Sequence, residues 1–243
     1  MLNEGRNGTY KLNLSPACKL SAGRDTAYKL TMALLKDGNM AVRIAACDAL
    51  LRLVDDVSFF PDSFVAYLPE AMAGIFGLLD QAREVDTKLR VLNAVSIVMQ
   101  GMGERVAPVV GGVLQAVPRL WEAAKQEQLL MGAVLVTITR LVEAMGDQVV
   151  TVIDFITGVI AFSTDVDAEY QLYTVEDGLE LWWATARRLE APHPPLLALF
   201  TNLVRVIQRD FDFLQLCMHV AESSLLCAPA DRVRTQGEGL GRL

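Results

Sequence analysis

Gly101-Met-Gly-Glu-Arg-Val106 and Ala144-Met-Gly-Asp-Gln-Val149 are two copies of one pattern, 43 residues apart in the sequence. In each copy a glycine, Gly103 or Gly146, ends a long segment with apolar residues at helical spacing, and a new apolar segment begins at the valine. Glycine is favoured there because many helices end on a residue with positive φ. A period near 40 residues is typical of stacked helical pairs. The repeat therefore predicts a helix, a break and another helix.

The same register extends along the chain. It predicts second helices that begin near Ala41, Asp86, Gln128, Tyr170 and Asp212, with spacings of 45, 42, 42 and 42 residues. It predicts first helices over Thr26–Leu35, Phe64–Ala82, Val106–Ala124, Val149–Ser163 and Pro194–Asp210. We therefore expect an all-α solenoid of about five helical pairs, because neighbouring pairs must stack to bury their apolar faces.

Two segments decide between helix and strand. The segment from Val149 to Phe162 is rich in valine and isoleucine, but its apolar residues recur at three and four positions and it is long for a strand. The segment from Tyr170 to Leu189 carries an apolar stripe that we expect to be buried, formed by Leu172, Val175, Leu179, Trp182, Ala186 and Leu189. Both segments are therefore predicted to be helical.

The two ends of the sequence lack this periodicity. Residues 1–25 mix Asn, Gly and Ser with few periodic apolar residues, and residues 228–243 are polar with three glycines and three arginines. We expect a loosely ordered segment over 1–25, the solenoid over 26–227 and a flexible tail over 228–243.

The composition excludes several classes of protein. Of the 243 residues, 52% are hydrophobic and 21% are charged, which favours a folded chain with a large core. The net charge of −7 has the wrong sign for binding nucleic acid through phosphate contacts. The longest stretch without Asp, Glu, Lys or Arg runs over 191–204 and contains three prolines, so we expect no membrane insertion.

Groups that could support chemistry are sparse. The four cysteines form no C-x-x-C pair, the histidines are His193 and His219, and no P-loop, G-x-S-x-G or H-E-x-x-H motif is present. His193 lies in an expected turn, where we predict a solvated side chain. Cys217 and His219 are too few for a tetrahedral metal site. We therefore predict no catalytic residues, no metal and no cofactor.

The first predicted turn resembles a HEAT repeat. Over Lys36–Ala46 it contains an Asp, a short gap, then Val-Arg and small residues. In that family the Asp caps the second helix and the Arg forms a ladder along the stack, and the matching residues are Asp37 and Arg43. Later repeats lose the Arg, so the sequence does not predict a continuous ladder. The resemblance makes the expected fold an all-α HEAT-repeat solenoid.

Several short motifs extend the resemblance to the importin-β (karyopherin) family. They are Leu51-Arg-Leu-Val-Asp-Asp56, Tyr67-Leu-Pro69, Asp86-Thr-Lys88, Ser163-Thr-Asp-Val166 and Glu176-Asp-Gly-Leu-Glu-Leu-Trp182. In order and spacing they are similar to middle-to-late HEAT repeats of that family, over about residues 30–225. Family members are commonly several times longer, with the main Ran-binding region in N-terminal repeats, so we expect this chain to be a fragment.

The resemblance implies a function in nuclear transport. It implies a receptor that binds basic protein cargo and the Ran GTPase, contacts nucleoporin FG repeats, and shuttles between cytoplasm and nucleus. The alternative, from another class, is a HEAT-repeat scaffold that assembles a multisubunit complex and is not a transport receptor. Neither function requires catalysis.

One stripe on the predicted helix after Tyr170 is a candidate partner-binding surface. The stripe contains Glu176, Glu180, Trp183 and Arg187 at spacings of four, three and four, with Asp177 beside Glu176. In a HEAT solenoid the second helices line the concave surface, where an acidic stripe with a tryptophan suits a basic cargo segment. The simpler interpretation is that Trp183 packs against the neighbouring repeat.

Overall fold

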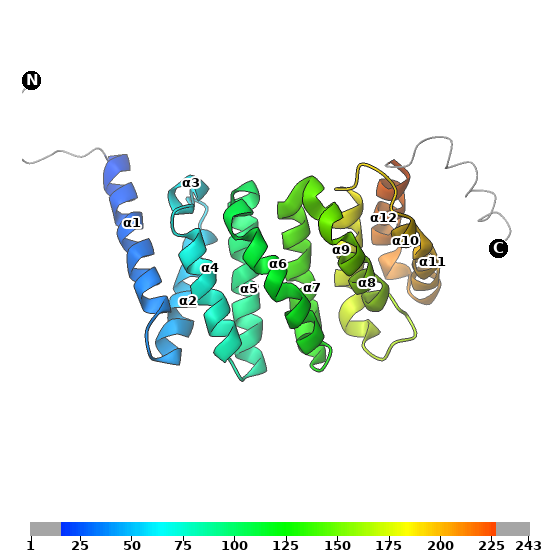
Figure 1. Cartoon of the computed structure of the whole chain (residues 1–243), viewed down its shortest axis with the longest axis horizontal. Helices are drawn as coiled ribbons and strands as arrows, with labels where there is room; N and C mark the ends of the chain where they lie inside the picture. Colours follow the sequence, from blue (N-terminus) through cyan, green and yellow to red (C-terminus); the bar gives the residue numbers. More distant parts are fainter. Residues whose placement is uncertain (1–15, 227–243) are drawn as a thin grey trace, which may run out of the picture.

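The computed structural model describes residues 16–226, and these residues form helices that stand side by side along one long axis (Figure 1). The first two pairs are α1 (Pro16–Leu35) with α2 (Met40–Val54), and α3 (Pro61–Phe64) and α4 (Leu68–Gln81) with α5 (Val85–Met102). The third is the 3₁₀ turn η1 (Gly103–Val106) and α6 (Ala107–Ala124) with α7 (Gln128–Met145). The fourth is the 3₁₀ turn η2 (Gly146–Val152) and α8 (Ile153–Ser163) with α9 (Gln171–Ala186). The fifth is α10 (Pro194–Ala198) and α11 (Phe200–Arg209) with η3 (Phe211–Phe213) and α12 (Leu214–Leu226).

The predicted architecture is confirmed. The chain is an all-α HEAT-repeat solenoid of five helical pairs, and no strand occurs within residues 16–226. Each second helix begins within two residues of its predicted start. The repeat spacing therefore located the second helices better than the composition of any single segment.

The two glycines of the repeated pattern have the predicted conformation. Gly103 ends α5 with a φ of 54°, and Gly146 ends α7 with a φ of 55°. No other described residue has positive φ. A side chain would be strained in this conformation, so glycine is required at both turns.

The first helices differ from the prediction in four places. The second, predicted as one helix over Phe64–Ala82, is divided into α3 and α4. Helix α1 begins at Pro16, so the expected loose segment over 1–25 is wrong for residues 16–25. Proline suits a helix start because the first-turn N–H groups have no partner within the helix. The fourth first helix begins as the 3₁₀ turn η2, and the fifth is divided at Leu199. The expectations for 1–15 and for 227–243 lie outside the described residues.

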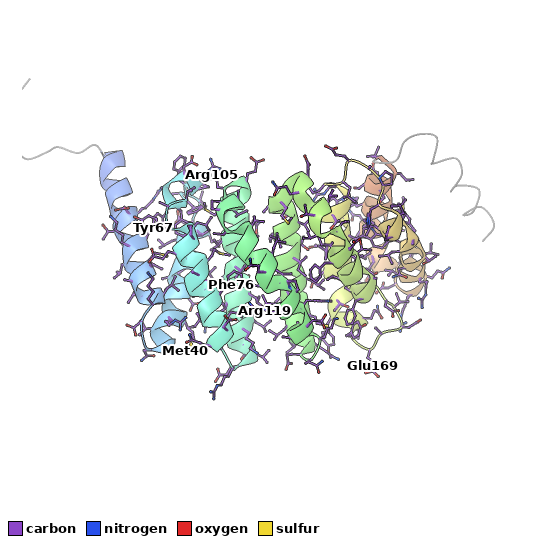
Figure 2. All side chains as sticks on the ribbon, in the orientation of Figure 1. Met40, Tyr67, Phe76, Arg105, Arg119 and Glu169 are labelled. Atoms are coloured by element: carbon purple, nitrogen blue, oxygen red, sulfur yellow. The ribbon has the colours of Figure 1, made fainter. Side chains whose placement is uncertain are left out.

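The helices form two layers. Second helices α5, α7 and α9 pack against one another far more extensively than first helices α4, α6 and α8 do. We call the two sides of the stack the second-helix face and the first-helix face. Figure 2 shows the turns at both edges of the stack, with Tyr67 and Arg105 at one edge and Met40 and Glu169 at the other. Closer packing of the second helices is expected for the inner side of a curved solenoid.

One hydrophobic core passes through all five pairs, from Tyr28 in α1 to Val220 in α12. Residues 128–163 include a window with a mean hydropathy of 1.6, apolar and long enough for a membrane span by composition. However, 56% of this window is buried between neighbouring helices, and the chain bends through η2 inside the segment. Core helices of soluble proteins have the same composition, so we attribute the hydropathy to packing.

Polar contacts join each pair to the next. Arg43 donates to the Leu35 carbonyl at 3.0 Å and to Gln81 Oε1 at 2.7 Å. Ser96 and Thr137, 41 residues apart, are hydrogen-bonded at 3.1 Å in the core between α5 and α7. Further contacts join Asp48 to Arg90 and Asp62 to Arg105. The stack therefore has varied cross-links in place of one Asp/Arg ladder.

Asp37 does not cap the second helix as the HEAT resemblance implied. Asn39 is the N-cap of α2, and its Oδ1 accepts from the Ala41 N–H at 2.9 Å. Asp37 Oδ1 accepts from the Asn39 N–H at 2.7 Å instead. The capping role passes to Asn39 because asparagine already stands at the position before the helix, where its side chain reaches the first free N–H groups.

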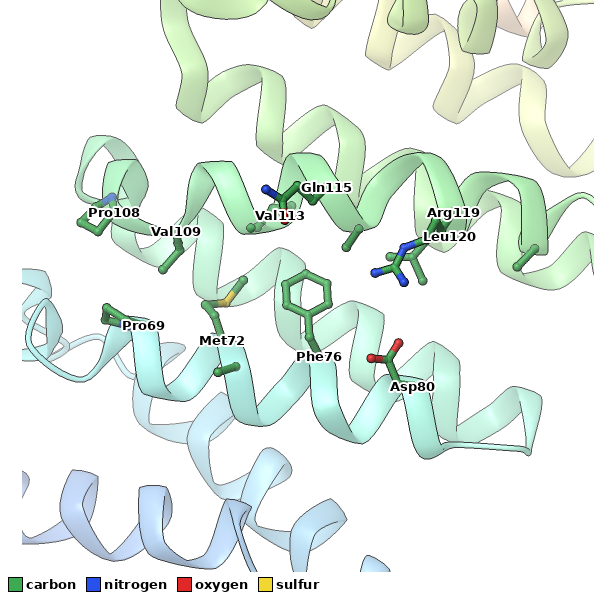
Figure 3. Close-up of a pocket in the computed structure, with 14 residues that line it drawn as sticks. Pro69, Met72, Phe76, Asp80, Pro108, Val109, Val113, Gln115, Arg119 and Leu120 are labelled. Carbon is green, nitrogen blue, oxygen red and sulfur yellow. The ribbon is translucent and has the colours of Figure 1, made fainter.

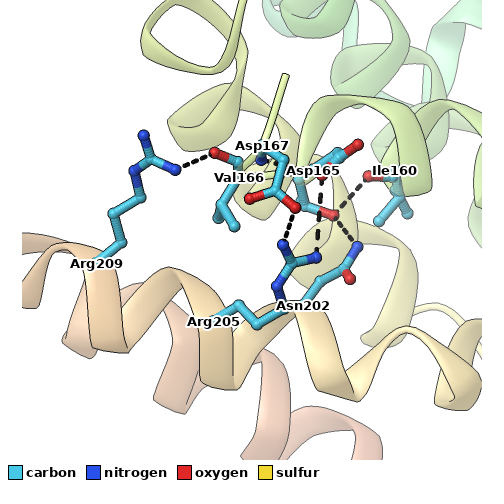
Figure 4. A network of polar contacts seen from close by, with 8 residues as sticks. Ile160, Asp165, Val166, Asp167, Asn202, Arg205 and Arg209 are labelled. Atoms are coloured by element: carbon cyan, nitrogen blue, oxygen red, sulfur yellow. Dashed lines mark hydrogen bonds and ion pairs between the residues drawn. The ribbon is translucent and has the colours of Figure 1, made fainter. Parts of the chain in front are cut away.

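The turn between α8 and α9 is held by the following helix α11 (Figure 4). Asn202 Nδ2 donates to Thr164 Oγ1 at 3.1 Å, Arg205 pairs with Asp165 and Asp167, and Arg209 donates to the Val166 carbonyl. This turn contains the Ser163–Val166 motif, so the motif serves a structural role between pairs four and five.

Candidate functional site

The predicted acidic residues lie on the second-helix face of α9. Glu176 and Glu180 are exposed, one helical turn apart. Neither carboxylate has a hydrogen-bond or ion-pair partner within residues 16–226. They are therefore available to a positively charged group from outside the chain.

Asp177 differs from its two neighbours because it is turned toward α7. Its Oδ2 lies so close to Gly132 that a methyl group on Gly132 would be 2.8 Å from it. Burial, together with the charges of Glu180 and Glu176, raises the pKa of Asp177 to about 6. Burial is the largest cause of this raised pKa, and the two neighbouring carboxylates add to it.

Trp183 is partly buried between two other side chains. Its ring stacks on the His219 ring of α12, with centroids 4.8 Å apart, and the Arg187 guanidinium carbon lies 4.3 Å from its centroid. The simpler interpretation of Trp183, packing against the neighbouring repeat, is therefore confirmed. Only part of the indole remains accessible to a partner.

A chain of charged contacts continues from Trp183 to α7. Arg187 lies 3.9 Å from Glu143, and Glu143 accepts from Arg140 at 2.8 Å. The positive charge near Trp183 is thus engaged within the protein. The free carboxylates occupy the other end of the α9 stripe.

The sequence analysis missed a groove beside Glu176. It has a volume of about 440 Å³ between α9 and the start of α12. Its lining residues are Glu176, Asp210, Asp212, Phe213, Gln215, Leu216 and His219. Three carboxylates thus surround a partly apolar floor. The signal in the sequence is the Asp-Phe-Asp run over 210–212, at the break before the last helix.

The predicted core stripe of α9 is wrong at its first member. Leu172 is 84% exposed, whereas Val175, Leu179 and Trp182 are fully buried. Gln171 and Thr174 take part in the buried side at the start of the helix. Polar residues therefore form the buried side of the first turn, and Leu172 faces solvent.

A second groove, also missed, runs along the first-helix face between α4 and α6 (Figure 3). It has a volume of about 550 Å³. Met72, Phe76 and Val113 form an apolar centre, and Ala73, Gly112 and Ala116 leave it open because they are small. Asp80 and Arg119 face each other near one end of the groove.

Aromatic rings fill the other junctions between successive pairs. The ring contacts are Tyr28 with Phe64 at 5.0 Å between pairs one and two, Trp121 with Phe162 at 5.4 Å between pairs three and four, and Trp182 with Phe200 at 5.8 Å between pairs four and five. Between pairs two and three, Phe76 has no aromatic partner within the described part of the chain. The junction between α4 and α6 therefore lacks the pair of aromatic rings found at the other junctions of residues 16–226.

The described cysteine and histidine side chains, considered above as chemical groups, are buried or partly buried between helices. Burial raises the pKa of the Cys47 thiol to about 12 and that of Cys217 to about 11. His193 is not solvated as expected, because its Nδ1 is buried and its Nε2 lies 3.7 Å from Asp154 Oδ1. Among residues 16–226, no group of three metal-ligating side chains comes together.

The fold is a helical-repeat solenoid with an acidic second-helix face and an open first-helix groove, an architecture of proteins that act through extended binding surfaces. A family model described as "Importin-11-like, TPR repeats" matches residues 132–241. The repeat period near 42 residues is longer than the 34 of a TPR and fits a HEAT repeat.

The curated relatives are importin-11 of Mus musculus and of Homo sapiens. Each is 32% identical over 217 residues, covering 89% of this chain and 22% of the relative. The repeats of this chain are therefore importin-11-like, and the resemblance to the importin-β family is confirmed. The chain spans about a fifth of the length of these relatives.

A solved structure has the same fold. It is that of Lph2 of S. cerevisiae, described as a bidirectional nuclear transport receptor, with a TM-score of 0.75 and 23% sequence identity. The match covers 84% of this chain and 21% of Lph2. At this identity the likeness bears on the solenoid fold alone.

Proposed function

We propose that this chain is part of a nuclear transport receptor that binds protein cargo and the Ran GTPase for import into the nucleus. The observation that carries the proposal is the 32% identity to importin-11 over 89% of the chain. The receptor acts by binding, without a catalytic step, and shuttles between cytoplasm and nucleus.

Ran binding provides the test of this function against the alternative scaffold. The purified chain is immobilised and exposed to Ran loaded with GTP or with GDP, and the captured Ran is quantified. Capture selective for the GTP form is expected. Capture that is absent or indifferent to the nucleotide, together with retention of a stable multisubunit complex, would favour the scaffold.

Basic cargo is proposed to bind the second-helix face at Glu176, Asp177, Glu180 and Trp183. The free carboxylates of Glu176 and Glu180 on one face of α9, together with Asp210 and Asp212 of the adjoining groove, complement a lysine- or arginine-rich segment. The accessible edge of Trp183 adds apolar contact area. Asp177 contributes through its charge more than through direct contact, because it is turned toward α7.

Charge reversal tests the cargo surface. The variant Glu176→Lys with Glu180→Lys is expected to bind a fluorescent lysine- and arginine-rich peptide at least tenfold more weakly at low salt, because rim charges attract through space. The control is Glu104→Lys with Asp147→Lys, which reverses the same charge at exposed turns outside α9. Equal weakening in both variants would contradict a local site.

Nucleoporin FG repeats are proposed to bind the α4/α6 groove. Other junctions of the stack hold pairs of aromatic rings, whereas here Phe76 stands alone beside an apolar space. A phenylalanine side chain from a repeat would complete this junction, as edge-to-face or offset rings do inside proteins. The small residues Ala73, Gly112 and Ala116 let the peptide backbone approach the helices.

A further inference from the structure

The α4/α6 groove continues into a second cavity near the edge of the stack. This cavity has a volume of about 370 Å³ and lies between the α4–α5 turn and the α6–α7 turn. Asp80, Leu120 and Ala123 line both cavities, so the two form one continuous opening between pairs two and three. We call the second cavity the turn pocket. Pairs one and four flank pairs two and three, so the opening is internal to the stack.

The turn pocket combines apolar and charged lining residues. Leu92 of α5 and Leu130 and Val134 of α7 line it and are almost fully buried. Arg83, in the α4–α5 turn, is exposed, and Lys88, in the first turn of α5, is half-buried. A ligand in this pocket would therefore meet an apolar surface with two cations beside it.

Positive charge is in excess along the joined opening. Its charged lining residues are Arg83, Lys88 and Arg119 against Asp80 and Glu127. Within residues 16–226, the side chains of these three cations have no hydrogen-bond or ion-pair partner. Asp80 faces Arg119 (Figure 3), so Arg83 and Lys88 are the cations most available to a partner. In a chain with a net charge of −7, this local excess favours an acidic partner.

The turn pocket and the groove between α9 and α12 carry opposite charges. The groove between α9 and α12 is lined by Glu176, Asp210 and Asp212 and by no lysine or arginine. The turn pocket is lined by Arg83 and Lys88, with Glu127 and the Asp80 of the facing pair. The basic segment proposed for the acidic surface therefore does not suit the turn pocket, which requires a different partner segment.

We infer that the segment bound in the α4/α6 groove is acidic close to its phenylalanine, with the ring beside Phe76 and its carboxylates at Arg83 and Lys88. This inference rests on the proposed binding of phenylalanine-glycine repeats to that groove. The turn pocket begins at Asp80, one helical turn or ~6 Å past Phe76 on α4. An extended peptide advances about 3.3 Å per residue, so the carboxylates belong about two to four residues from the phenylalanine.

Two fluorescent peptides of equal length test this preference. Both contain one Phe-Gly, and one peptide has glutamates three residues before and three residues after the phenylalanine, where the other has glutamines. At low salt the wild-type chain is expected to bind the glutamate peptide about threefold to tenfold more tightly, measured by fluorescence anisotropy. The variant Arg83→Gln with Lys88→Gln should lose this preference and bind the glutamine peptide as wild type does.

A matched variant controls for the overall charge of the chain. Arg52→Gln with Arg188→Gln removes two exposed cations that line neither the groove nor the turn pocket, and it should keep the wild-type preference. A preference lost equally in both variants would overturn the inference, because the effect would then come from net charge. Unchanged helical circular dichroism shows that each variant is folded.

The remaining outcomes separate this inference from the function on which it rests. Equal binding of both peptides by wild type would overturn the acidic preference and leave the repeat-binding groove standing. A preference that persists in Arg83→Gln with Lys88→Gln would overturn the role of the turn pocket. Binding of neither peptide would overturn the repeat-binding groove itself, and the inference with it.

Discussion

The junction between α4 and α6 and the junction between α6 and α8 are built on opposite sides of the same helix, and only one of them is filled. On the α8 side, Trp121 meets Phe162 edge to face, and Phe162 stacks on Tyr170 with centroids 4.2 Å apart. Lys125 lies over the Phe162 ring at 5.2 Å. On the α4 side, Phe76 borders a groove of about 550 Å³. The arrangement of helices is thus the same at both junctions. The side chains between the helices determine whether a junction is closed by the core or open to solvent.

The sequence of α6 differs between the two sides in the same way. Gly111 and Gly112 have open space where a side chain would stand, so close packing does not require glycine there. Pro118 lies inside the helix and removes one backbone hydrogen bond. The exposed side of α6 therefore contains residues of low helix propensity. The other side is stabilised by the contacts of Trp121 with Phe162 and of Phe162 with Tyr170.

The largest expected difference between the junctions is in stability. Trp121→Ala should lower the free energy of unfolding by about 3–5 kcal/mol, because it empties a buried aromatic site. Phe76→Ala should cost only about 1 kcal/mol, because that ring is partly solvated and has no ring partner. Urea denaturation followed by circular dichroism measures both. Similar losses in the two variants would mean that the α4/α6 groove is part of the core.

Glycine-to-alanine substitutions distinguish a closely packed helix contact, at Gly178, from an open groove, at Gly112. A Cβ at Gly178 in α9 would be 2.3 Å from Ser163 Oγ and 2.7 Å from its Cβ, so Gly178→Ala should destabilise the fold by about 1–3 kcal/mol. Gly112→Ala should stabilise it by up to ~1 kcal/mol, because alanine favours the helix and nothing obstructs it. Thermal melts of the two variants should therefore shift in opposite directions. A lower melting temperature for Gly112→Ala would contradict an open groove.

The smallest expected effect concerns the acidic second-helix face. The pKa of Asp177 rises from 3.8 to about 6 in the folded chain, so the fold binds this proton more tightly than the unfolded chain does. The protonated Asp177 side chain therefore contributes to the stability of the fold below pH 4, and this contribution is lost as the pH rises through 6. Asp177→Asn should therefore stabilise the chain by about 1 kcal/mol at pH 7, allowing for solvent screening, and by almost nothing at pH 4.

Unfolding curves of Asp177→Asn and wild type across this pH range measure the difference. Asp147→Asn, at an exposed turn, is the matched control. A stabilisation by Asp177→Asn that is equal at both pH values would exclude the electrostatic cause.

The fold was largely predictable because its decisive signals are local and periodic. The glycines at 103 and 146 mark helix ends by backbone conformation alone, and the repeat carries that register to the other pairs. The acidic stripe at Glu176 and Glu180 followed from helical spacing. The grooves were not predictable, because each one depends on which side chains the neighbouring helical pair places in the space between the two pairs.

Particular residues show this limit. The sequence of α9 places Trp183 on an acidic face. Its stacking partner His219 lies 36 residues later, so helical spacing within α9 could not reveal the contact. Leu172 has the spacing of a core residue but is exposed, because Gln171 and Thr174 form the buried side of this turn. Phe76 and Gly112 have no special pattern in their own helices, and only the absence of a second ring between α4 and α6 gives them a role.

The most direct test of the proposed nucleoporin binding at the α4/α6 groove is a titration with a phenylalanine-glycine repeat peptide. Ala116→Phe places a ring in the groove and should make this junction like the others, with stability kept and peptide binding weakened at least tenfold. Ala41→Phe adds the same ring on an exposed site of α2 and should bind as wild type does. Binding that is unchanged in Ala116→Phe, or absent from wild type, would contradict the account.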